Sequence, residues 1–410
     1  MNKSGTQPRP LLAVILFSSL IFLLASPGVF AFTPTPASAT GPGTLSSKTF
    51  VSAPPTGTKG PDDITLMAID GHDGERTLVW TNYQNGINPD GTPGTAGGPT
   101  KSTIAGYDLA TGALVMTFQV TGKVDGLTAD PELGALIATV NEDSHSAIDL
   151  VYPETGAVVT YAFSPSPEVA SNGGTDSIAV SGNQVYVVHS NPNDAAQPTE
   201  YRVHFDKSTL TAKLTPVFYD NSMGTDALTG ATVKLALTDP DTSFFMPRAS
   251  PRFGGALATI GQADGQIVFA TRLGHNPHLK VLTITDNKPG NVPPTDGLAV
   301  ATSRHGTLYV VDASASKIYA LDTTGWPAGT VFIGEPKDQG NPIVGTLNLF
   351  TGKITPLGNS FVSPKGLLFV PSDEGDDHGE HGDAQGPLAS LAVVSLAASL
   401  ALISVPKVSA

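Results

Sequence analysis

Short apolar runs rich in Val, Ile, Leu and Tyr recur along the chain, each bounded by turn residues. One unit contains the pattern in full, with runs at 124–129, 135–140, 147–151 and 158–163. We expect four short strands joined by hairpins there, because such runs between turn signals are typical of antiparallel strands. Comparable units start with a β-rich run at the following positions: Asp63, Val124, Thr175, Gly254, Thr295 and Ser363. Second strands are expected after most of these starts, for example at 184–188, 266–270 and 307–311.

A turn motif of the form Asp or Asn, two or three residues, then Gly closes many of these hairpins. It occurs at 107–112, 321–325 and 347–352, with Tyr152 in place of the Asp or Asn at 151–156, and a degenerate copy lies at 204–209. The Asp or Asn side chain caps the turn, and the Gly supplies the positive φ that a tight hairpin needs. Repeated four-stranded units with such turns predict an all-β β-propeller. Six starts predict six blades, with five or seven as alternatives.

The segment 221–252 is longer than the repeat predicts. We expect 238–242, which reads Thr-Asp-Pro-Asp-Thr, to be an inserted loop, and the next blade to begin at Gly254. We assign the whole repeating body to residues 61–372.

The two ends of the chain have a different composition from this body. Residues 1–31 carry Lys3 and Arg9, an apolar stretch and a small residue at the end, which is typical of a signal peptide and predicts a signal helix. A Pro/Thr/Ser-rich linker is expected at 32–60, with a closing strand around Phe50. An acidic and His-containing spacer follows the body at 373–387, and 388–405 is a hydrophobic tail. This tail predicts a hydrophobic helix that serves as a membrane anchor or a cleaved attachment signal, or else an apolar tail. We therefore expect an extracellular or surface-attached monomer.

Charge, composition and missing motifs exclude several classes of function. The net charge is −14 and only 14% of residues are charged, so nucleic acid is not an expected partner. The chain contains no Cys, which in an exported protein means that the core alone stabilises the fold. Motifs of serine hydrolases, zinc proteases and phosphate-binding loops are absent from the sequence.

Acidic residues are expected to meet at the axis of the propeller, because the innermost strands of all blades begin on one face. Four of these starts carry a carboxylate and are candidate metal ligands: Asp63, Asp125, Asp176 and Asp296. The remaining starts carry Arg252 and Lys365. Loops after the second strands add further candidate ligand-binding residues: Asn82, Asn141, His189, Arg272 and Asp312. Oxygen-only ligation suits Ca²⁺. The alternative is that each Asp only hydrogen-bonds the backbone of its own loop.

The sequence resembles the gluconolactonase-like and NHL-type propellers. The resemblance lies in Thr-Asp-Gly-Leu-Ala-Val, Gly-x-Leu-Tyr-Val-Val-Asp and Lys-Ile-Tyr-Ala-Leu-Asp-x-Thr-Gly within 295–325, and in 344–370 as a closing blade. It implies a divalent cation in the central channel, held by residues at the inner-strand starts. Asp63, Asp125, Asp176 and Asp296 match those positions, but the family uses Glu and Asn as well as Asp.

Two functions are compatible with these features. The first is a non-catalytic propeller that binds a protein or small-molecule ligand on the face built by the loops 84–101 and 190–199. The alternative is a divalent-metal-dependent hydrolase of lactones or small esters, with its site in the central channel.

Overall fold

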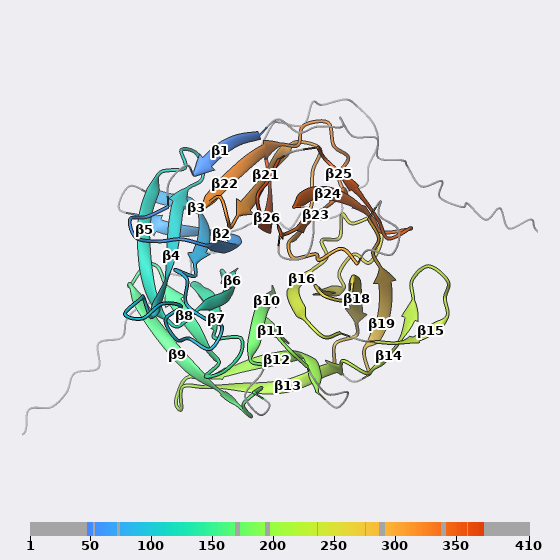
Figure 1. The fold of residues 1–410 in the computed structure, drawn as a ribbon, viewed down its shortest axis with the longest axis horizontal. Coiled ribbons are helices and arrows are strands. Elements are labelled where there is room, and N and C mark those ends of the chain that lie inside the picture. Colours follow the sequence, from blue (N-terminus) through green and yellow to red (C-terminus); the bar gives the residue numbers. More distant parts are fainter. Residues whose placement is uncertain are drawn as a thin grey trace, which may run out of the picture. The chain divides into compact units, whose positions relative to one another are not determined.

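The computed structural model describes residues 47–372 apart from 52–53, 72–73, 169–172, 193–196, 236, 275, 287–291, 338–341 and 359. Regular structure in this part of the chain is entirely β, with 26 strands in five hydrogen-bonded sheets. The sheets surround a common centre and present one innermost strand each, or two in the largest sheet, towards it (Figure 1). This radial arrangement is that of a β-propeller.

Three four-stranded groups follow one another in the first half of the chain. The first is β2 (Pro61–Gly71), β3 (Gly74–Tyr83), β4 (Lys101–Asp108) and β5 (Leu114–Thr121). The second is β6 (Val124–Asp130), β7 (Ala135–Val140), β8 (Ala147–Tyr152) and β9 (Ala157–Ser164). The third is β10 (Thr175–Ser181), β11 (Gln184–His189), β12 (Pro198–Asp206) and β13 (Thr211–Tyr219). The second and third groups share one eight-stranded sheet because their outer strands, β9 and β13, pair in parallel.

The next sheet contains a correction to the sequence-based expectation. It comprises β14 (Met223–Asp226), β15 (Thr232–Lys234), β16 (Pro240–Phe245), β17 (Leu257–Gly261), β18 (Gln266–Thr271) and β19 (His278–Thr283). Its innermost strand is β16, so the predicted inserted loop at 238–242 in fact leads into and begins that strand. The run after Gly254 is therefore the second strand of its group, not the first.

The chain crosses from one of the last two sheets to the other and back again. One contains β20 (Leu298–Val300), β23 (Val331–Glu335), β24 (Ile343–Asn348) and β25 (Lys353–Pro356). The other contains β26 (Pro364–Pro371), β21 (Gly306–Asp312), β22 (Lys317–Asp322) and β1 (Ser47–Val51). The chain leaves the first sheet after β20, forms the β21–β22 hairpin in the second, and then returns. The expectation that 295–300 and 307–311 are adjacent strands of one unit is wrong, because β20 pairs with β23 and β21 pairs with β26.

The strand β1 joins the beginning of the described chain to its end. It pairs antiparallel with β22, and the same sheet contains β26, the last strand. Phe50 packs edge-on against Tyr309 at 4.8 Å, and Val51 is buried in the same cluster. A closing strand around Phe50 was predicted, and the structure has one there, inside the stretch assigned to the linker.

The predicted turn motif has the expected geometry. Oδ1 of Asp108 accepts hydrogen bonds from the backbone N–H and the hydroxyl of Thr111, and Gly112 has a φ of +70°. In the turn at 347–352, Oδ1 of Asn348 accepts from the Phe350 N–H, and Gly352 has a φ of +70°. An Asx cap followed by a left-handed Gly thus closes these hairpins.

Hydrophobic clusters lie between neighbouring sheets. Trp80 and Ile104 of the first group, for example, pack in one cluster with Leu136 and Ala138 of the second, and all four are 0% exposed. Large apolar side chains therefore hold adjacent sheets face to face, which leaves the starts of the innermost strands to line the centre.

The predicted signal peptide at 1–31, the spacer at 373–387 and the tail at 388–405 lie outside the described residues, as does most of the linker before β1. Among the residues that the structure does describe, no helix has the length and apolar character needed to cross a membrane.

Candidate functional site in the central channel

The innermost strands carry an ionisable residue at one equivalent place, at or just before the strand start. We call this the ring position. Its occupants, one each from β2, β6, β10, β16, β20 and β26, are Asp62, Asp125, Asp176, Asp241, Asp296 and Lys365. The following residue must be small where the next strand packs closely: a Cβ on Gly297 would lie 2.0 Å from the Lys365 carbonyl oxygen. Close packing of the inner strands therefore brings the ring residues together.

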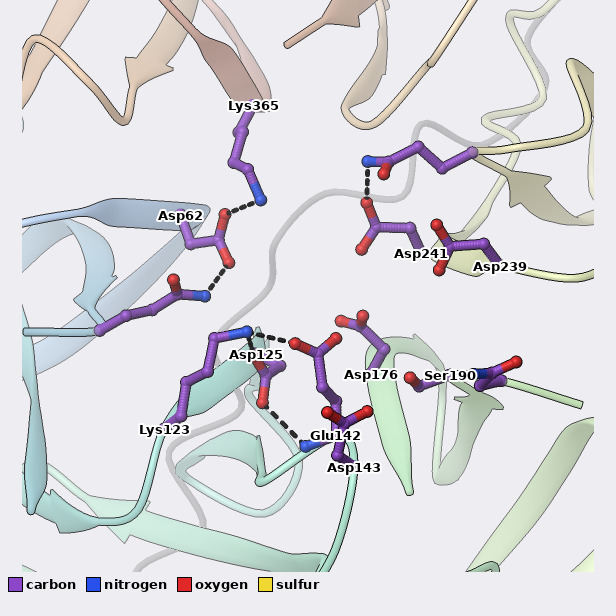
Figure 2. A pocket seen from close by; sticks show the side chains of 13 residues that line it. Asp62, Lys123, Asp125, Glu142, Asp143, Asp176, Ser190, Asp239, Asp241 and Lys365 are labelled. Atoms are coloured by element: carbon purple, nitrogen blue, oxygen red, sulfur yellow. Dashed lines mark hydrogen bonds and ion pairs between the residues drawn. The ribbon is translucent and has the colours of Figure 1, made fainter. Parts of the chain in front are cut away.

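A polar cavity of about 460 Å³ lies where these residues meet, and we call it the mouth cavity. Figure 2 shows their side chains pointing towards a shared space. The residues that line it are Asp62, Gln84, Lys123, Asp125, Glu142, Asp143, Asp176, Ser190, Asn191, Asp239, Asp241, Gln262 and Lys365. Seven of these are carboxylates and two are lysines, so the cavity has an excess of acidic groups.

Both lysines form ion pairs inside this cavity (Figure 2). Nζ of Lys365 lies 2.9 Å from Oδ1 of Asp62 and 3.4 Å from Oδ2 of Asp296. Nζ of Lys123 lies 2.5 Å from Oδ1 of Asp125 and also pairs with Glu142. These carboxylates raise the pKa of each lysine although burial acts in the opposite direction, so both ammonium groups stay charged.

Asp176 and Asp241 both line the mouth cavity, and each acts on the protonation of the other. Burial and the neighbouring Asp241 raise the pKa of Asp176 well above its ordinary value. Burial also raises the pKa of Asp241, but the Lys365 ammonium and the interaction with Asp176 lower it. Two interacting buried carboxyls cannot both ionise cheaply, and the pKa of Asp176 is the more strongly raised, so Asp176 is the protonated member and Asp241 is the carboxylate.

Two further acids in the channel are held partly protonated near neutral pH. Burial, with the charges of Asp241 and Glu142, raises the pKa of Asp239 to about 7. Burial, with the charge of Asp62, raises the pKa of Asp63 to about 8. Asp63 lines a second, smaller cavity further along the channel, whose volume is about 100 Å³. The channel therefore stores protons on several groups.

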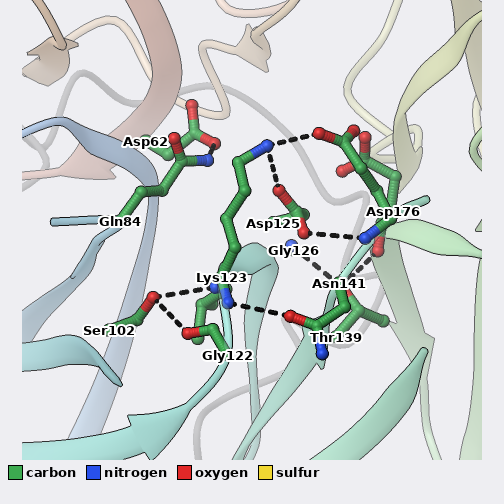
Figure 3. A network of polar contacts seen from close by, with 12 residues as sticks. Asp62, Gln84, Ser102, Gly122, Lys123, Asp125, Gly126, Thr139, Asn141 and Asp176 are labelled. Atoms are coloured by element: carbon green, nitrogen blue, oxygen red, sulfur yellow. Dashed lines mark hydrogen bonds and ion pairs between the residues drawn. The ribbon is translucent and has the colours of Figure 1, made fainter. Parts of the chain in front are cut away.

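Backbone contacts of the strand ends place Lys123 beside its carboxylates (Figure 3). The Lys123 N–H donates to Oδ1 of Asn141 at 3.0 Å. Oγ of Ser102 accepts from the Val124 N–H at 2.9 Å and donates to the Gly122 carbonyl at 2.8 Å. The segment before β6 is thus held on both sides, and the Lys123 side chain is directed to the mouth cavity.

Of the predicted site residues, Asp125, Asp176 and Lys365 line the mouth cavity, and Asp63 lines the smaller one. Asp296 contacts Lys365 from the neighbouring strand start. Asp63 is one residue beyond the ring position, and its Oδ2 accepts from the Leu127 N–H at 2.8 Å. Asp62, and not Asp63, is therefore the equivalent of Asp125, since successive side chains of a strand point in different directions.

The remaining predicted residues do not line the mouth cavity, and their contacts hold loops and strands. Asn82 accepts from the Asp63 N–H and donates to the Val124 carbonyl, each at 2.8 Å. Asp312 accepts from the backbone N–H groups of Val362 and Ser363, just before Lys365. Asn141, as described, positions Lys123.

His189, Arg252 and Arg272 also make contacts outside the mouth cavity. Nε2 of the buried His189 lies 3.0 Å from the Pro167 carbonyl oxygen. The Arg252 guanidinium donates to the Leu349 carbonyl at 2.8 Å and lies over the Phe253 ring. Arg272 contacts His278 at 3.2 Å. Arg252 was expected at the axis only because β16 was mistaken for a loop.

Sequence reasoning missed several cavity residues. Asp239 and Lys123 both stand two positions before a ring residue, and Gln84 and Gln262 both directly follow a second strand. Each of these glutamines donates to the ring carboxylate of its own sheet, Asp62 and Asp241 respectively. The spacing relative to the strand ends was the available signal, but it could be used only with correct strand boundaries.

The resemblance noted in the sequence implies a divalent cation in this channel. The donors are carboxylate oxygens, which Ca²⁺ prefers. Within the described part of the chain, however, no group of three or more acidic or His side chains is arranged to hold a metal ion. The Lys123 and Lys365 ammonium groups lie where the carboxylates of Asp125, Glu142, Asp62 and Asp296 would otherwise face a cation. The residues in this arrangement therefore do not fit a divalent metal.

Comparison with protein-family models and with curated proteins found no match. Solved structures similar to the chain include gluconolactonase-like propellers. A protein provisionally described as a gluconolactonase has a TM-score of 0.42 and 9% identity, covering 81% of this chain and 91% of its own. One from Bacteroides fragilis, provisionally described as a 6-phosphogluconolactonase, has a TM-score of 0.40 and 11% identity, covering 78% and 100%. Hydrazine synthase of Kuenenia stuttgartiensis matches at 0.36 and 13%, covering 72% and 67%.

The prediction of a non-catalytic propeller that binds on its loop face is corrected in favour of its alternative. In this chain itself, protonated and ionised acids and buried lysines meet in the channel, an arrangement typical of acid–base chemistry.

Proposed function

We propose that this chain is a hydrolase that opens lactones or small esters in the mouth cavity. The observation that carries the proposal is the meeting of Asp176, Asp241 and the Lys365 ammonium in one cavity, with Asp176 protonated and Asp241 ionised. A carboxyl and a carboxylate in one cavity supply a general acid and a general base at one place. The lysine adds a fixed positive charge where the substrate carbonyl would develop negative charge.

The chemistry follows from these protonation states. The Asp241 carboxylate accepts a proton from a water molecule as the water oxygen bonds to the substrate carbonyl carbon. The Lys365 ammonium stabilises the negative charge on the carbonyl oxygen. The bond between the carbonyl carbon and the ring or ester oxygen then breaks, and Asp176 donates its proton to that leaving oxygen. The product is a hydroxy acid or an acid and an alcohol, and transfer of the proton from Asp241 to Asp176 restores the pair.

The charge of the cavity limits the substrate. Seven carboxylates and two lysines line it, and both lysines already pair with carboxylates. An anionic substrate would be repelled, whereas a neutral ester or lactone would not. We therefore propose a neutral substrate whose hydroxyl groups donate hydrogen bonds to the remaining carboxylates.

Asparagine substitutions in the full chain test this function. Hydrolysis of a neutral aldonolactone and of p-nitrophenyl acetate would be followed in a pH-stat. We expect Asp176→Asn and Asp241→Asn each to lower kcat about 100-fold or more, because each removes a proton-transfer group. Asp70→Asn, at an exposed position of β2, is the matched control and should leave the rate unchanged. A wild-type chain that hydrolyses neither substrate class, or variants as active as wild type, would refute the proposal.

Two features of the whole chain belong to this proposal. We propose that the six four-stranded groups are the six blades of the propeller, with β14 and β15 as an addition to one of them. The composition of 1–31 supports export, and that of 388–405 supports attachment at the outer surface. The enzyme would then act outside the cell.

A further inference from the structure

The ring position has one exceptional occupant. Five of its six residues are aspartates, and the sixth is Lys365 on β26. Its Nζ lies within 3.4 Å of both neighbouring ring residues, Asp62 and Asp296. The charge of Asp241, across the ring, also contributes to the raised pKa of Lys365. A single ammonium group therefore serves three of the five ring carboxylates.

The other ring carboxylates have partners of their own. Lys123 pairs with Asp125 from two positions before the ring. Asp176 stays protonated and needs no counter-charge, because it is buried beside other acids of the same cavity. Each ionised ring carboxyl is thus faced by an ammonium group of this chain. A divalent cation would have to displace one or both ammonium groups, which repel it at close range.

We infer that Lys123 and Lys365 take the electrostatic role that a divalent cation would have in this channel, so that the site works without a metal. The inference rests on the proposed hydrolase function for its catalytic meaning. Its structural content is independent of that function: the two lysines, by their charge, keep divalent cations out of a ring of acids. Lys365 is then the residue that stabilises the developing oxyanion, and Lys123 keeps Asp125 and Glu142 neutralised.

Calcium binding to the full chain tests the charge argument directly. After dialysis against EDTA, isothermal titration with Ca²⁺ alone should give no stoichiometric binding to the wild type. Lys365→Met, and Lys123→Met with Lys365→Met, keep most of the side-chain volume but remove the charge. We expect these variants to bind Ca²⁺ roughly tenfold or more tightly than wild type, because carboxylates are left uncompensated. Lys213→Met, on the exposed face of β13, is the matched control and should bind like wild type.

A conservative variant guards against loss of folding. Lys365→Arg keeps the positive charge, so it should remain unable to bind Ca²⁺ and should melt near the wild-type temperature. If the Met variants unfold without metal, added Ca²⁺ should raise their melting temperature and leave those of wild type and Lys365→Arg unchanged. Stoichiometric Ca²⁺ binding by wild type, or no gain in any Met variant, would overturn the inference.

Activity separates the inference from the function on which it rests. Hydrolysis that persists in EDTA supports the inference. Hydrolysis that EDTA abolishes and Ca²⁺ restores would overturn it while the hydrolase proposal stands. Absence of hydrolysis under all conditions would refute the function and the catalytic role of Lys365, whereas the Ca²⁺ titrations would still decide whether the lysines exclude the metal.

Discussion

At the scale of single residues, burial determines how acids behave in this molecule, both inside the channel and outside it. Glu200 on β12 is 0% exposed, and its carboxyl faces the neighbouring sheet. Its carboxyl accepts hydrogen bonds from Oγ1 of Thr259 at 2.8 Å and from Oγ of Ser243 at 3.2 Å. Burial raises the pKa of Glu200 to about 8, although these hydroxyls lower it. Glu200 is therefore protonated in the folded protein at neutral pH.

This leads to a prediction for Glu200→Gln. Because the folded pKa lies above the ordinary value of 4.5, the stability that Glu200 contributes is fully present below pH 4.5 and is lost as pH rises through about 8. The loss should reach about 4 kcal/mol at pH 8.5, and the glutamine variant should not show it. Urea denaturation of both proteins between pH 5 and 8.5 measures the difference. The exposed Glu75→Gln should behave like wild type, and parallel pH profiles for wild type and Glu200→Gln would contradict the prediction.

At the scale of elements, the sequence predicted those features that short-range patterns of residues determine. Hairpins closed by Asx–Gly turns, the all-β class and the strand around Phe50 follow from short-range signals, and the structure contains them. The strand β16, which is the innermost of its sheet, was missed because it begins with Pro240 and Asp241. It also has polar residues where a strand pattern would place apolar ones. Its pairing with β17, a long-range contact, is what makes it a strand.

The candidate site was predicted only in part for the same reason. Asp125, Asp176 and Lys365 were found because Gly or Ser and an apolar run follow them. Asp62 was passed over for its neighbour Asp63, a slip of one residue that reverses the side-chain direction in a strand. Strand exchange between β20 and β21 could not be foreseen, since both runs fit either sheet by pattern alone and only packing against β26 distinguishes them.

The closing strand β1 permits an element-scale prediction. Val51 is 3% exposed and packs in a cluster with Val79 and Ile318, while Ser47 on the same strand is exposed. Val51→Asp buries a charge without a partner or detaches the strand, and we expect a loss of about 4 kcal/mol. The melting temperature should fall by about 10 °C, whereas Ser47→Asp, with the same added charge, should change it by about 2 °C at most. Thermal melts followed by circular dichroism test this, and equal shifts would show that β1 does not close the ring.

At the scale of the whole molecule, ring closure brings together acids from distant parts of the sequence. Asp62 on the first innermost strand and Lys365 on the last lie 2.9 Å apart between their charged atoms. The same closure places several carboxyls in one buried volume, where they repel each other and keep protons. Fold, charge compensation and the proposed chemistry therefore depend on the same arrangement of inner strands.

The pH dependence of global stability follows from this arrangement. Burial raises the pKa of Asp63 to about 8 and that of Asp239 to about 7, and it raises that of Asp176 as well. Each such acid contributes stability that is complete below its unfolded pKa of 3.8 and is lost as pH rises through its folded pKa. Glu142, whose pKa its contact with Lys123 helps to lower, acts in the opposite sense, but only as pH falls below its ordinary 4.5. Burial lowers the pKa of His189, so this residue also acts in the opposite sense as pH falls below its ordinary 6.5, but the several acids outweigh a single imidazole. The raised pKa values of the lysines matter only near and above 10.5.

We therefore expect the free energy of unfolding to be highest near pH 5 and to decrease steadily to pH 8, unlike that of a protein whose carboxylates are all ion-paired. The slope of this free energy against pH should correspond to more than one proton released on unfolding, since several acids contribute besides Glu200. Urea denaturation of Glu200→Gln across this range shows the channel acids more clearly, because that variant lacks a buried acid outside the channel whose pKa is about 8. Adding Asp239→Asn should reduce the remaining slope between pH 6 and 8, as it removes the group that titrates near 7. A flat profile in Glu200→Gln would mean that the channel carboxyls are already ionised at pH 5 and that the ring does not hold protons, which would also remove the acid from the proposed hydrolysis.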